Sequence, residues 1–293
     1  MARLPSAEIR RAVRLGLEED LGQGDVTTSA LFSKPAPARA TIVAQQPLIV
    51  AGMAAAVQTF LIVDPTLTLT VVRHDGEPAK NGKPILHVDG DGRSILQAER
   101  VALNFLQHLS GIATLTHRFC TAVKGYKARI LDTRKTLPGW RALQKWAVAL
   151  GGGVNHRLSL GDGVLIKDNH LALLRQGKQA VRSACRLAKA TATDSMPIIV
   201  EAESLAEVRQ ALAGNADIIL LDNMTPTMVR RSVTLINGRA TVEVSGGITL
   251  KNVRAMAAAG ADRISVGALT HSAPAASLSL VIAPARNQPR RPG

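Results

Sequence analysis

The sequence predicts an α/β protein in two parts, an α+β region with a mostly antiparallel sheet and then a (β/α) barrel. Up to about residue 93, strand-like runs alternate with Gly- and Asp-rich turns. From residue 128 onward, short apolar strands alternate strictly with helices. Such repeated βα units are typical of parallel strands buried on both faces.

The first part begins with an expected amphipathic helix, because the first 22 residues mix acids and bases around apolar positions. The expected strands are the runs ATIVAQQPLIVAG, LTLTVV and PILHVDG, separated by HDGEPAKNGKP and DGDG. A long helix is expected from Ser94 to Val123, because apolar residues such as Val101, Phe105 and Leu109 recur at helical spacing.

The second part contains six expected strands: RILDT, GVLIKDN, PIIVEAE, ADIILLDN, TVEVSGG and ADRISVGAL. A barrel fits better than an open sheet, because no Gly-rich dinucleotide turn follows the first strand. Four helices are expected to end in a left-handed glycine, at Gly151, Gly214, Gly238 and Gly260.

The composition bounds the function without deciding it. The chain has 293 residues and a net charge of +14, which suits nucleic acid, acidic membranes or anionic small substrates. Aromatic residues make up only 2%, which excludes the stacking platform of single-strand binders. Part of the excess charge lies in ARNQPRRPG, which is expected to be a solvated tail.

No targeting or redox signal is visible. The longest apolar stretch, LIVAGMAAAV, is too short for a bilayer, and the N-terminus has no apolar signal-peptide core. The two cysteines, Cys120 and Cys185, lie far apart without metal or redox spacing. We therefore expect a cytoplasmic protein with reduced thiols.

Polar residues close all six barrel strands: Asp132 to Lys135, Lys167 to Asn169, Glu201, Asp222-Asn223, Ser245 to Gly247, and Gly267-Ala268. In a βα barrel these carboxyl ends converge on one face, where the active site is built. The sequence therefore predicts an active site there.

The chemistry of that face is divided. Cations that suit carboxylates and phosphates come from Arg134, Lys135, His156, Arg157 and Lys167. Two carboxylates, Glu201 and Asp222, suit Mg²⁺ shared with a pyrophosphate, although they could also merely neutralise nearby lysines.

The last two loops are rich in glycine. Ser245-Gly246-Gly247 and Gly267 offer backbone N–H groups to a phosphate, where barrel enzymes often bind one. Ordinary tight turns remain an alternative. GGGVNHR is open to the same two interpretations, since Gly151 also suits a helix end.

These motifs resemble one known family. RVALNFLQHLSGIAT, LDTRKTLPGWR, GGGVNHRLSL, VLIKDNH, IILLDNM, EVSGGI and SVGALTHS, with the earlier GDVTT, look like quinolinate phosphoribosyltransferase, also called nicotinate-nucleotide pyrophosphorylase (carboxylating). The resemblance runs from about residue 20 to 280. It implies a pentosyltransferase that joins quinolinate to 5-phosphoribosyl-1-pyrophosphate, releases CO₂ and pyrophosphate, and supplies nicotinate mononucleotide for NAD biosynthesis.

The resemblance also implies an architecture. It indicates an α/β sandwich domain over residues 1–115, on which the C-terminal end could pack back, an open (β/α) barrel over 116–280 and a basic tail over 281–293. It further implies a homodimer in which each sandwich domain faces the partner's barrel mouth.

Site residues follow from the same resemblance. The quinolinate site would comprise Thr133, Arg134, His156, Arg157 and Lys167, with Arg100 reaching in from the other subunit. The phosphoribosyl pyrophosphate site would comprise Lys135, Glu201, Asp222, Ser245, Gly246, Gly247, Val266, Gly267, Ala268 and His271. Lys135, Lys167, Glu201 and Asp222 would carry the catalysis, the last two holding Mg²⁺ directly or through water.

Three other interpretations compete. A catalytically silent basic barrel that binds nucleic acid would explain the charge, but not the acids and glycine loops at the strand ends. A nicotinate transferase would need fewer cations than surround Arg134, His156 and Arg157. A sister family linked to molybdate transport departs at the DTRK and KDNH motifs, which are intact here.

Overall fold

The computed structural model describes residues 6–174, 177–193 and 196–284, which form two compact units. The first unit takes in the described residues up to Leu115, then Leu137–Gly151, and the described residues from Ala273 onward. The second comprises Thr116–Thr136 and the described residues of Gly152–Ser272. The chain therefore returns twice to the first unit, once with Leu137–Gly151 and once with its C-terminal end.

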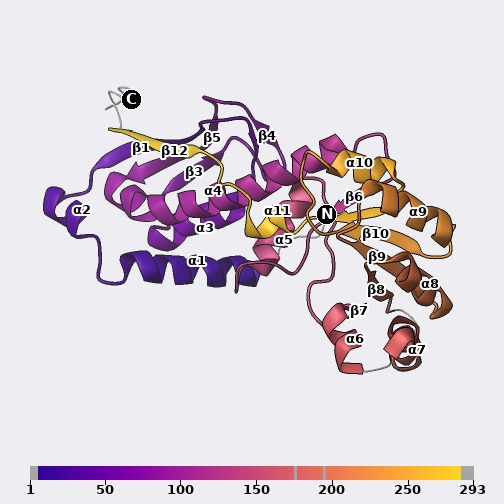
Figure 1. Cartoon of the computed structure of the whole chain (residues 1–293). Coiled ribbons are helices and arrows are strands. Elements are labelled where there is room, and N and C mark those ends of the chain that lie inside the picture. Colours follow the sequence, from indigo (N-terminus) through magenta and orange to yellow (C-terminus); the bar gives the residue numbers. More distant parts are fainter. Residues whose placement is uncertain (1–5, 175–176, 194–195, 285–293) are drawn as a thin grey trace. The chain divides into compact units, whose positions relative to one another are not determined.

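The first unit combines an antiparallel sheet with helices (Figure 1). Its strands are β1 (Pro37–Ala44), β2 (Leu48–Ile49), β3 (Thr68–Val71), β4 (Pro78–Ala79), β5 (Pro84–Asp91) and β12 (Leu278–Pro284). Its helices are α1 (Ser6–Leu21), α2 (Val26–Leu31), α3 (Met53–Val63), the start of α4 (Gly92–Ala122) and α5 (Arg141–Leu150). The main sheet has the order β12-β1-β5-β3, and β2 pairs with β4.

Alternation along β1 builds this sheet. Ala38, Ala40, Ile42 and Ala44 are buried on one face, as a strand of period two requires when one face is covered. They pack in a core with Leu86, Val88, Phe60, Ile95 and other apolar side chains of the unit.

The chain's last described strand completes the sheet. Strand β12 pairs antiparallel with β1 from Ala44↔Leu278 to Ala38↔Pro284, and Figure 1 shows the yellow strand beside the indigo one. Residues 281–284, which the expected domain boundaries included in the basic tail, are therefore part of a strand. The rest of the expected tail, residues 285–293, lies outside the described residues.

The second unit carries a six-stranded parallel sheet in the order β6-β11-β10-β9-β8-β7. Its strands are β6 (Arg129–Leu131), β7 (Val164–Ile166), β8 (Ile198–Ala202), β9 (Ile218–Asp222), β10 (Thr241–Ser245) and β11 (Arg263–Ser265). Its helices after the end of α4 are α6 (Asp168–Leu174), η1 (Gly177–Gln179), α7 (Ala180–Thr191), α8 (Leu205–Ala213), α9 (Pro226–Ile236), α10 (Val253–Ala258) and α11 (Ala268–His271).

The α/β fold class predicted from the sequence is confirmed. All strand pairs of the second unit are parallel, and the helices α8, α9 and α10 alternate with its strands along the chain. Among the described residues, the first and last strands in the sheet order, β6 and β7, form no ladder with each other. The sheet is therefore open between them.

Local sequence signals set the helix ends. Helix α8 starts with a capping box between Ser204 and Glu207, and α9 starts with Thr225 as N-cap and Pro226 in its first turn. Gly238 and Gly260 have φ values of 73° and 102°, as expected for left-handed helix ends.

The same expectation was wrong at two other glycines. Gly151 and Gly214 have φ values of −74° and −93°. The left-handed residue comes one position later, at Gly152 with φ 92° and at Asn215 with φ 58°. Helices α5 and α8 do end directly before these glycines, at Leu150 and Ala213, so only the left-handed conformation was misplaced.

Within the described ranges, no helix combines the length and the apolar character needed to cross a bilayer.

Candidate active site

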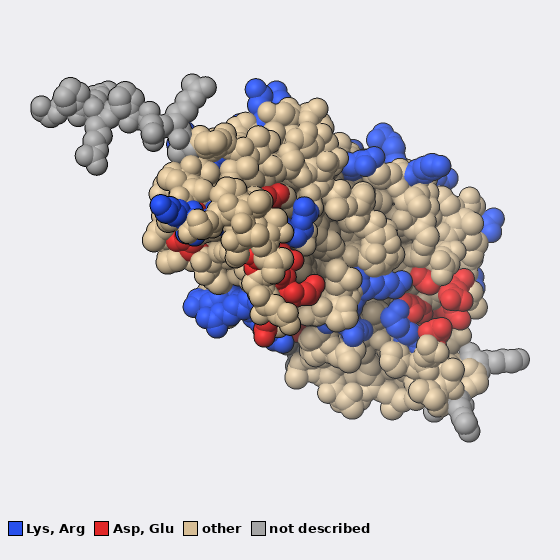
Figure 2. Space-filling model, turned by 90° about the vertical axis from the view of Figure 1, so that its left-hand side faces the viewer, with Lys and Arg blue, Asp and Glu red and all other residues tan. Residues whose placement is uncertain are grey.

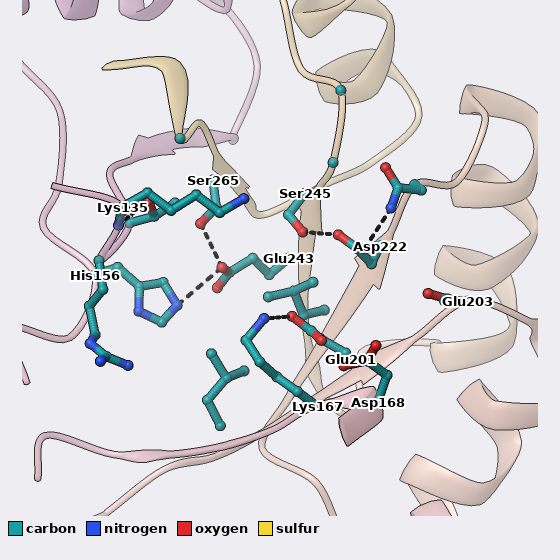
Figure 3. Close-up of a pocket in the computed structure, with 18 of the residues that line it drawn as sticks. Lys135, His156, Lys167, Asp168, Glu201, Glu203, Asp222, Glu243, Ser245 and Ser265 are labelled. Atoms are coloured by element: carbon teal, nitrogen blue, oxygen red, sulfur yellow. Dashed lines mark hydrogen bonds and ion pairs between the residues drawn. The ribbon is translucent and has the colours of Figure 1, made fainter. Parts of the chain in front are cut away.

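A cavity of about 630 Å³ lies at the carboxyl ends of the second unit's strands. Its basic and Ser/Thr lining comprises Thr133, Arg134, Lys135, His156, Arg157, Lys167, Ser245 and Ser265. The acidic and remaining lining comprises Asp168, Glu201, Glu203, Asp222, Glu243, Asn223, Gly246, Gly247, Gly267, Leu165 and Leu220. Figure 3 shows Lys135 and His156 on one side of this pocket and Glu201, Glu203 and Asp222 on the other, with Glu243 and Lys167 between them.

Two arginines dominate the cationic side. Arg157 donates from Nη1 to the carbonyl of Gly163 at 2.9 Å, whereas the buried Nε atoms of Arg157 and Arg134 have no hydrogen-bond partner. Burial and the neighbouring charge of Arg134 lower the pKa of Arg157. Two like charges with unsatisfied buried donors indicate a place for an anion.

A buried carboxylate holds the turn that carries Arg157. Asp132, at the end of β6, is fully buried and accepts hydrogen bonds from the backbone N–H of His156 at 2.8 Å and from Asn155 Nδ2 at 2.6 Å. The turn is thereby tied to the sheet. Asp132 was predicted as a strand-end residue without a role of its own.

His156 has both ring nitrogens engaged. The backbone N–H of Arg157 donates to Nδ1 at 2.8 Å, and Nε2 lies 3.2 Å from Glu243 Oε1. A nitrogen that accepts cannot carry a proton, so these contacts select the neutral tautomer with its proton on Nε2.

The acidic side begins with Glu201, at the end of β8. It forms an ion pair with Lys167 (Figure 3). Burial raises the pKa of Glu201; Lys167 opposes this shift, and the charges of Asp222 and Asp168 add to it. The carboxylates on this side therefore lie close enough together to repel each other.

Asp222, at the end of β9, is held by two donors. It accepts from the hydroxyl of Ser245 and from Asn223 Nδ2, the latter at 2.7 Å. Asn223 itself has a left-handed φ of 53° and donates its backbone N–H to the carbonyl of Ser245 at 3.0 Å. The ends of β9 and β10 are thereby fastened to each other.

The glycine loop after β10 depends on this contact. A Cβ on Gly246 would lie 2.2 Å from Asn223 Oδ1, and both Gly246 and Gly247 have positive φ values. Any side chain at Gly246 would therefore push Asn223 away. On the opposite loop, a Cβ on Gly267 would lie 3.1 Å from His271 Nε2 and 3.3 Å from Lys135 Cδ.

The donors present limit the kind of metal site. Among the described residues, no group of three or more His, Cys, Asp or Glu side chains is arranged to hold a metal ion. Glu201 and Asp222 supply two carboxylates that face one pocket. That set fits Mg²⁺ bound with one or two carboxylates and phosphate oxygens, not a metal enclosed by protein ligands alone.

The pocket contains most, but not all, of the residues that the sequence singled out. Val266, Ala268 and His271 lie on the adjoining loop and on α11 without lining the cavity, and the backbone N–H of Val266 is bonded to the carbonyl of Leu131. Arg100 is an exposed residue of α4 in the first unit.

Sequence reasoning missed several lining residues. Asp168, Glu203 and Asn223 follow predicted strand ends, so their positions were visible but no role was given to them. Glu243 and Ser265 lie within strands and were treated as ordinary strand residues. A charged residue inside the buried run TVEVS was the signal that could have identified Glu243.

Comparison with known families decides the family. The model described as "Quinolinate phosphoribosyl transferase, N-terminal domain" matches residues 25–110, and the corresponding C-terminal domain model matches residues 112–281. The chain belongs to the quinolinate phosphoribosyltransferase family. Together the two matches span both units of the structure.

Individual members of this family are similar over nearly their whole length. A nicotinate-nucleotide pyrophosphorylase [carboxylating] from Mycobacterium leprae is 42% identical over 272 residues, which cover 90% of this chain and 93% of that protein. A probable enzyme of the same name from Bacillus subtilis is 38% identical, with 89% of each chain covered. The solved nicotinate-nucleotide pyrophosphorylase from Francisella tularensis superimposes with a TM-score of 0.87 at 36% identity, covering 96% of this chain and 98% of that one.

Proposed function

We propose that this member of the quinolinate phosphoribosyltransferase family transfers the phosphoribosyl group of 5-phosphoribosyl-1-pyrophosphate to quinolinate. The reaction releases pyrophosphate and CO₂ and yields nicotinate mononucleotide for NAD biosynthesis. The observation that carries the proposal is the divided pocket. Arg134 and Arg157 present unpartnered Nε donors on one side, and Glu201 and Asp222 adjoin the glycine loop on the other.

The cationic side suits a pyridine dicarboxylate. Bringing a dianion beside a pyrophosphate is unfavourable in a partly enclosed cleft unless cations compensate the charge. Arg134 and Arg157 can each engage a carboxylate through a planar guanidinium. Lys167 and Thr133 lie on the same lining and complete the set proposed for quinolinate. The neutral His156 would not supply a charge, but would hold the backbone of Arg157 in place through its Nδ1 atom.

The acidic side suits the phosphoribosyl donor. We assign Lys135 and the backbone around Gly246, Gly247 and Gly267 to the phosphate groups, and Glu201 and Asp222 to ribose hydroxyls and Mg²⁺. Mg²⁺, when bound, would neutralise charge on the departing pyrophosphate. The two carboxylates would also stabilise positive charge that develops at ribose C1.

The order of bond changes follows from the acceptor's chemistry. The pyridine nitrogen bonds to ribose C1 as the bond to pyrophosphate breaks, which leaves the ring nitrogen positively charged. The bond between the adjacent ring carbon and its carboxylate then breaks, the carboxylate departs as CO₂, and the electron pair stays on that carbon, where the positive nitrogen stabilises it. The resulting ring carbanion then takes up a proton. Catalysis consists mainly of positioning and charge stabilisation.

A shared dimeric site is part of the proposal. Arg100 lies on α4, outside the pocket lining, and would serve the site of a second copy. Hybrid dimers of Arg100→Ala chains with Lys135→Ala chains should regain part of the activity that each homodimer lacks. Hybrids that form without any recovery would contradict the shared site.

The central test is product formation with Mg²⁺ and the phosphoribosyl donor, offering quinolinate, nicotinate and nicotinamide in parallel. We expect nicotinate mononucleotide and CO₂ from quinolinate, and no product from the other two. A folded protein that uses nicotinate equally well would contradict the assignment of the arginine pair to a second carboxylate. Cell fractionation would test the expected cytoplasmic location.

Nucleic-acid binding finds less support. On the face drawn in Figure 2, Lys and Arg side chains are scattered and are interrupted by acidic groups, so they do not form one continuous basic stripe there. Steeply salt-dependent binding to duplex DNA that the phosphoribosyl donor does not displace would favour it.

A further inference from the structure

The floor of the pocket contains a buried charge that the proposed reaction does not yet use. Glu243 is in the middle of β10 between the buried Val242 and Val244, and its side chain is 0% exposed. Parallel pairing sets it opposite Leu220 of β9 and Arg263 of β11. A carboxylate in such a position is costly unless neighbouring donors compensate for the lost water.

The neighbours of Glu243 supply that compensation at one oxygen. Oε1 accepts from Ser265 Oγ at 2.6 Å and faces His156 Nε2 at 3.2 Å, as Figure 3 shows. Oε2 has no hydrogen-bond partner and lies 3.7 Å from Arg263 Nη1. Burial raises the pKa of Glu243, whereas the hydrogen bonds with His156 and Ser265 and the charge of Arg263 lower it.

The contacts of its two ring nitrogens determine the state of His156. Nδ1 already accepts from the Arg157 backbone N–H, so the single proton of the neutral ring is on Nε2, directed at Glu243. The imidazole thus connects the buried carboxylate to the peptide that begins Arg157. The side chain of His156 is only 9% exposed, which leaves little room for another orientation.

We propose that Glu243 is a positioning residue for the transfer reaction. By accepting a hydrogen bond from His156 it fixes one neutral tautomer and, through the Arg157 backbone, directs Arg157 toward a substrate carboxylate. The inference rests on the proposed function for its kinetic consequence. Its structural part concerns only the state of His156.

Two substitutions of Glu243 separate the effect of its hydrogen bond from the effects of its charge and its volume. Glu243→Gln retains an acceptor oxygen for His156 and Ser265, whereas Glu243→Leu removes it and fills much of the same space. We expect Glu243→Leu to raise the KM for quinolinate about tenfold or more and to leave the KM for the phosphoribosyl donor within about twofold. Glu243→Gln should stay within about threefold of the native KM for quinolinate.

A second measurement does not depend on activity. In protein with ¹⁵N-labelled histidine rings, assigned by comparison with His156→Gln, the spectrum should show a neutral His156 with its proton on Nε2. Glu243→Gln should retain that signature, and Glu243→Leu should lose it. Ser232→Ala, which alters another fully buried side chain of the same unit outside the pocket, controls for a general loss of stability.

Three outcomes would overturn the inference. The first is a native His156 that is doubly protonated or carries its proton on Nδ1. The second is a Glu243→Leu enzyme with a native KM for quinolinate, or with equal rises in both KM values. The third is a Glu243→Gln enzyme as impaired as Glu243→Leu. A native protein that forms no product would instead refute the proposed function and leave the spectroscopic result standing.

Discussion

The cores built on the main sheets of the two units differ in chemistry. The sheet of the first unit packs its inner face with apolar side chains such as Ile42, Leu86 and Val88. The parallel sheet of the second unit has the fully buried carboxylates of Asp132 and Glu243 beneath a polar pocket. Buried apolar side chains need no hydrogen-bond partners, whereas a buried carboxylate is stable only when matched donors surround it. In this molecule those donors lead directly to the residues that face the substrate.

The largest expected effect tests the polar interior. Arg157→Ala should lower kcat/KM for quinolinate about 10³-fold, because it removes a charge-assisted contact that the cleft cannot replace. It should leave the melting temperature unchanged or higher, because burial and the charge of Arg134 already disfavour the Arg157 cation. Steady-state kinetics and thermal melts on the same preparation measure both.

Arg182 provides a matched control for that prediction. Its Nε is also buried without a hydrogen-bond partner, but Arg182 is on α7 of the same unit and does not line the pocket. Arg182→Ala should change kcat/KM by less than about twofold. An equal loss of activity in both variants would contradict the link between unsatisfied donors and substrate binding.

The apolar interior of the first unit should respond in the opposite way. Leu86→Ala should reduce the free energy of unfolding by about 3 kcal/mol, because it leaves a cavity in a fully buried core. Leu61→Ala, at a position that is 37% exposed, should cost less than about 1 kcal/mol. Denaturant titrations test the difference, and kcat should remain native in both. A large loss of kcat in a Leu86→Ala protein that is fully folded would contradict the distinction between the two interiors.

A third test compares the two ends of one strand. Asp222 is at the pocket end of β9, and Asp217 precedes the strand's other end, paired with Lys189 at 2.9 Å. Asp222→Asn should lower kcat about 10²-fold, because a charge facing the donor is lost. Asp217→Asn should leave kcat within about twofold and slightly lower the melting temperature. Similar kinetics in the two variants would remove the proposed role of Asp222.

The sequence correctly predicted the parts of the structure whose residue spacing is regular. Helix α4 was expected over Ser94 to Val123 and runs from Gly92 to Ala122, because its apolar spacing is regular. The barrel strands and the pocket residues at their ends followed from the βα alternation. These features depend on local periodicity, which a single sequence displays.

The rest depends on contacts between distant segments. No local pattern reveals that Leu278–Pro284 pairs with β1, or that Leu137–Gly151 packs with the first unit. The orientation of His156 likewise needs Glu243, which is 87 positions away along the chain. The proposed role of Arg100 came from family resemblance alone. An exposed arginine on a helix does not by itself indicate a function.

The smallest expected effect concerns a surface carboxylate of the first unit. The hydrogen bonds from the Arg93 side chain, followed by those from the backbone N–H groups of Ala36 and Arg93, lower the pKa of Asp91 to about 2. A carboxyl whose folded pKa is depressed stabilises the fold above its unfolded value near 4. That stabilisation is lost as the pH falls from about 4 toward 2.

Asp91→Asn should therefore lower the free energy of unfolding at pH 7 by about 1 kcal/mol, since solvent screens much of this partly exposed pair. The melting temperature should fall by about 2–4 °C. The difference between the two proteins should shrink as melts are repeated from pH 5 down to pH 3, because the unfolded native chain takes up a proton at Asp91 before the folded protein does. A difference that stays constant over this range would mean that Asp91 acts through its shape at the start of α4. The stability of the first unit would then not depend on the charge of Asp91, which would sharpen the contrast with the second unit's interior.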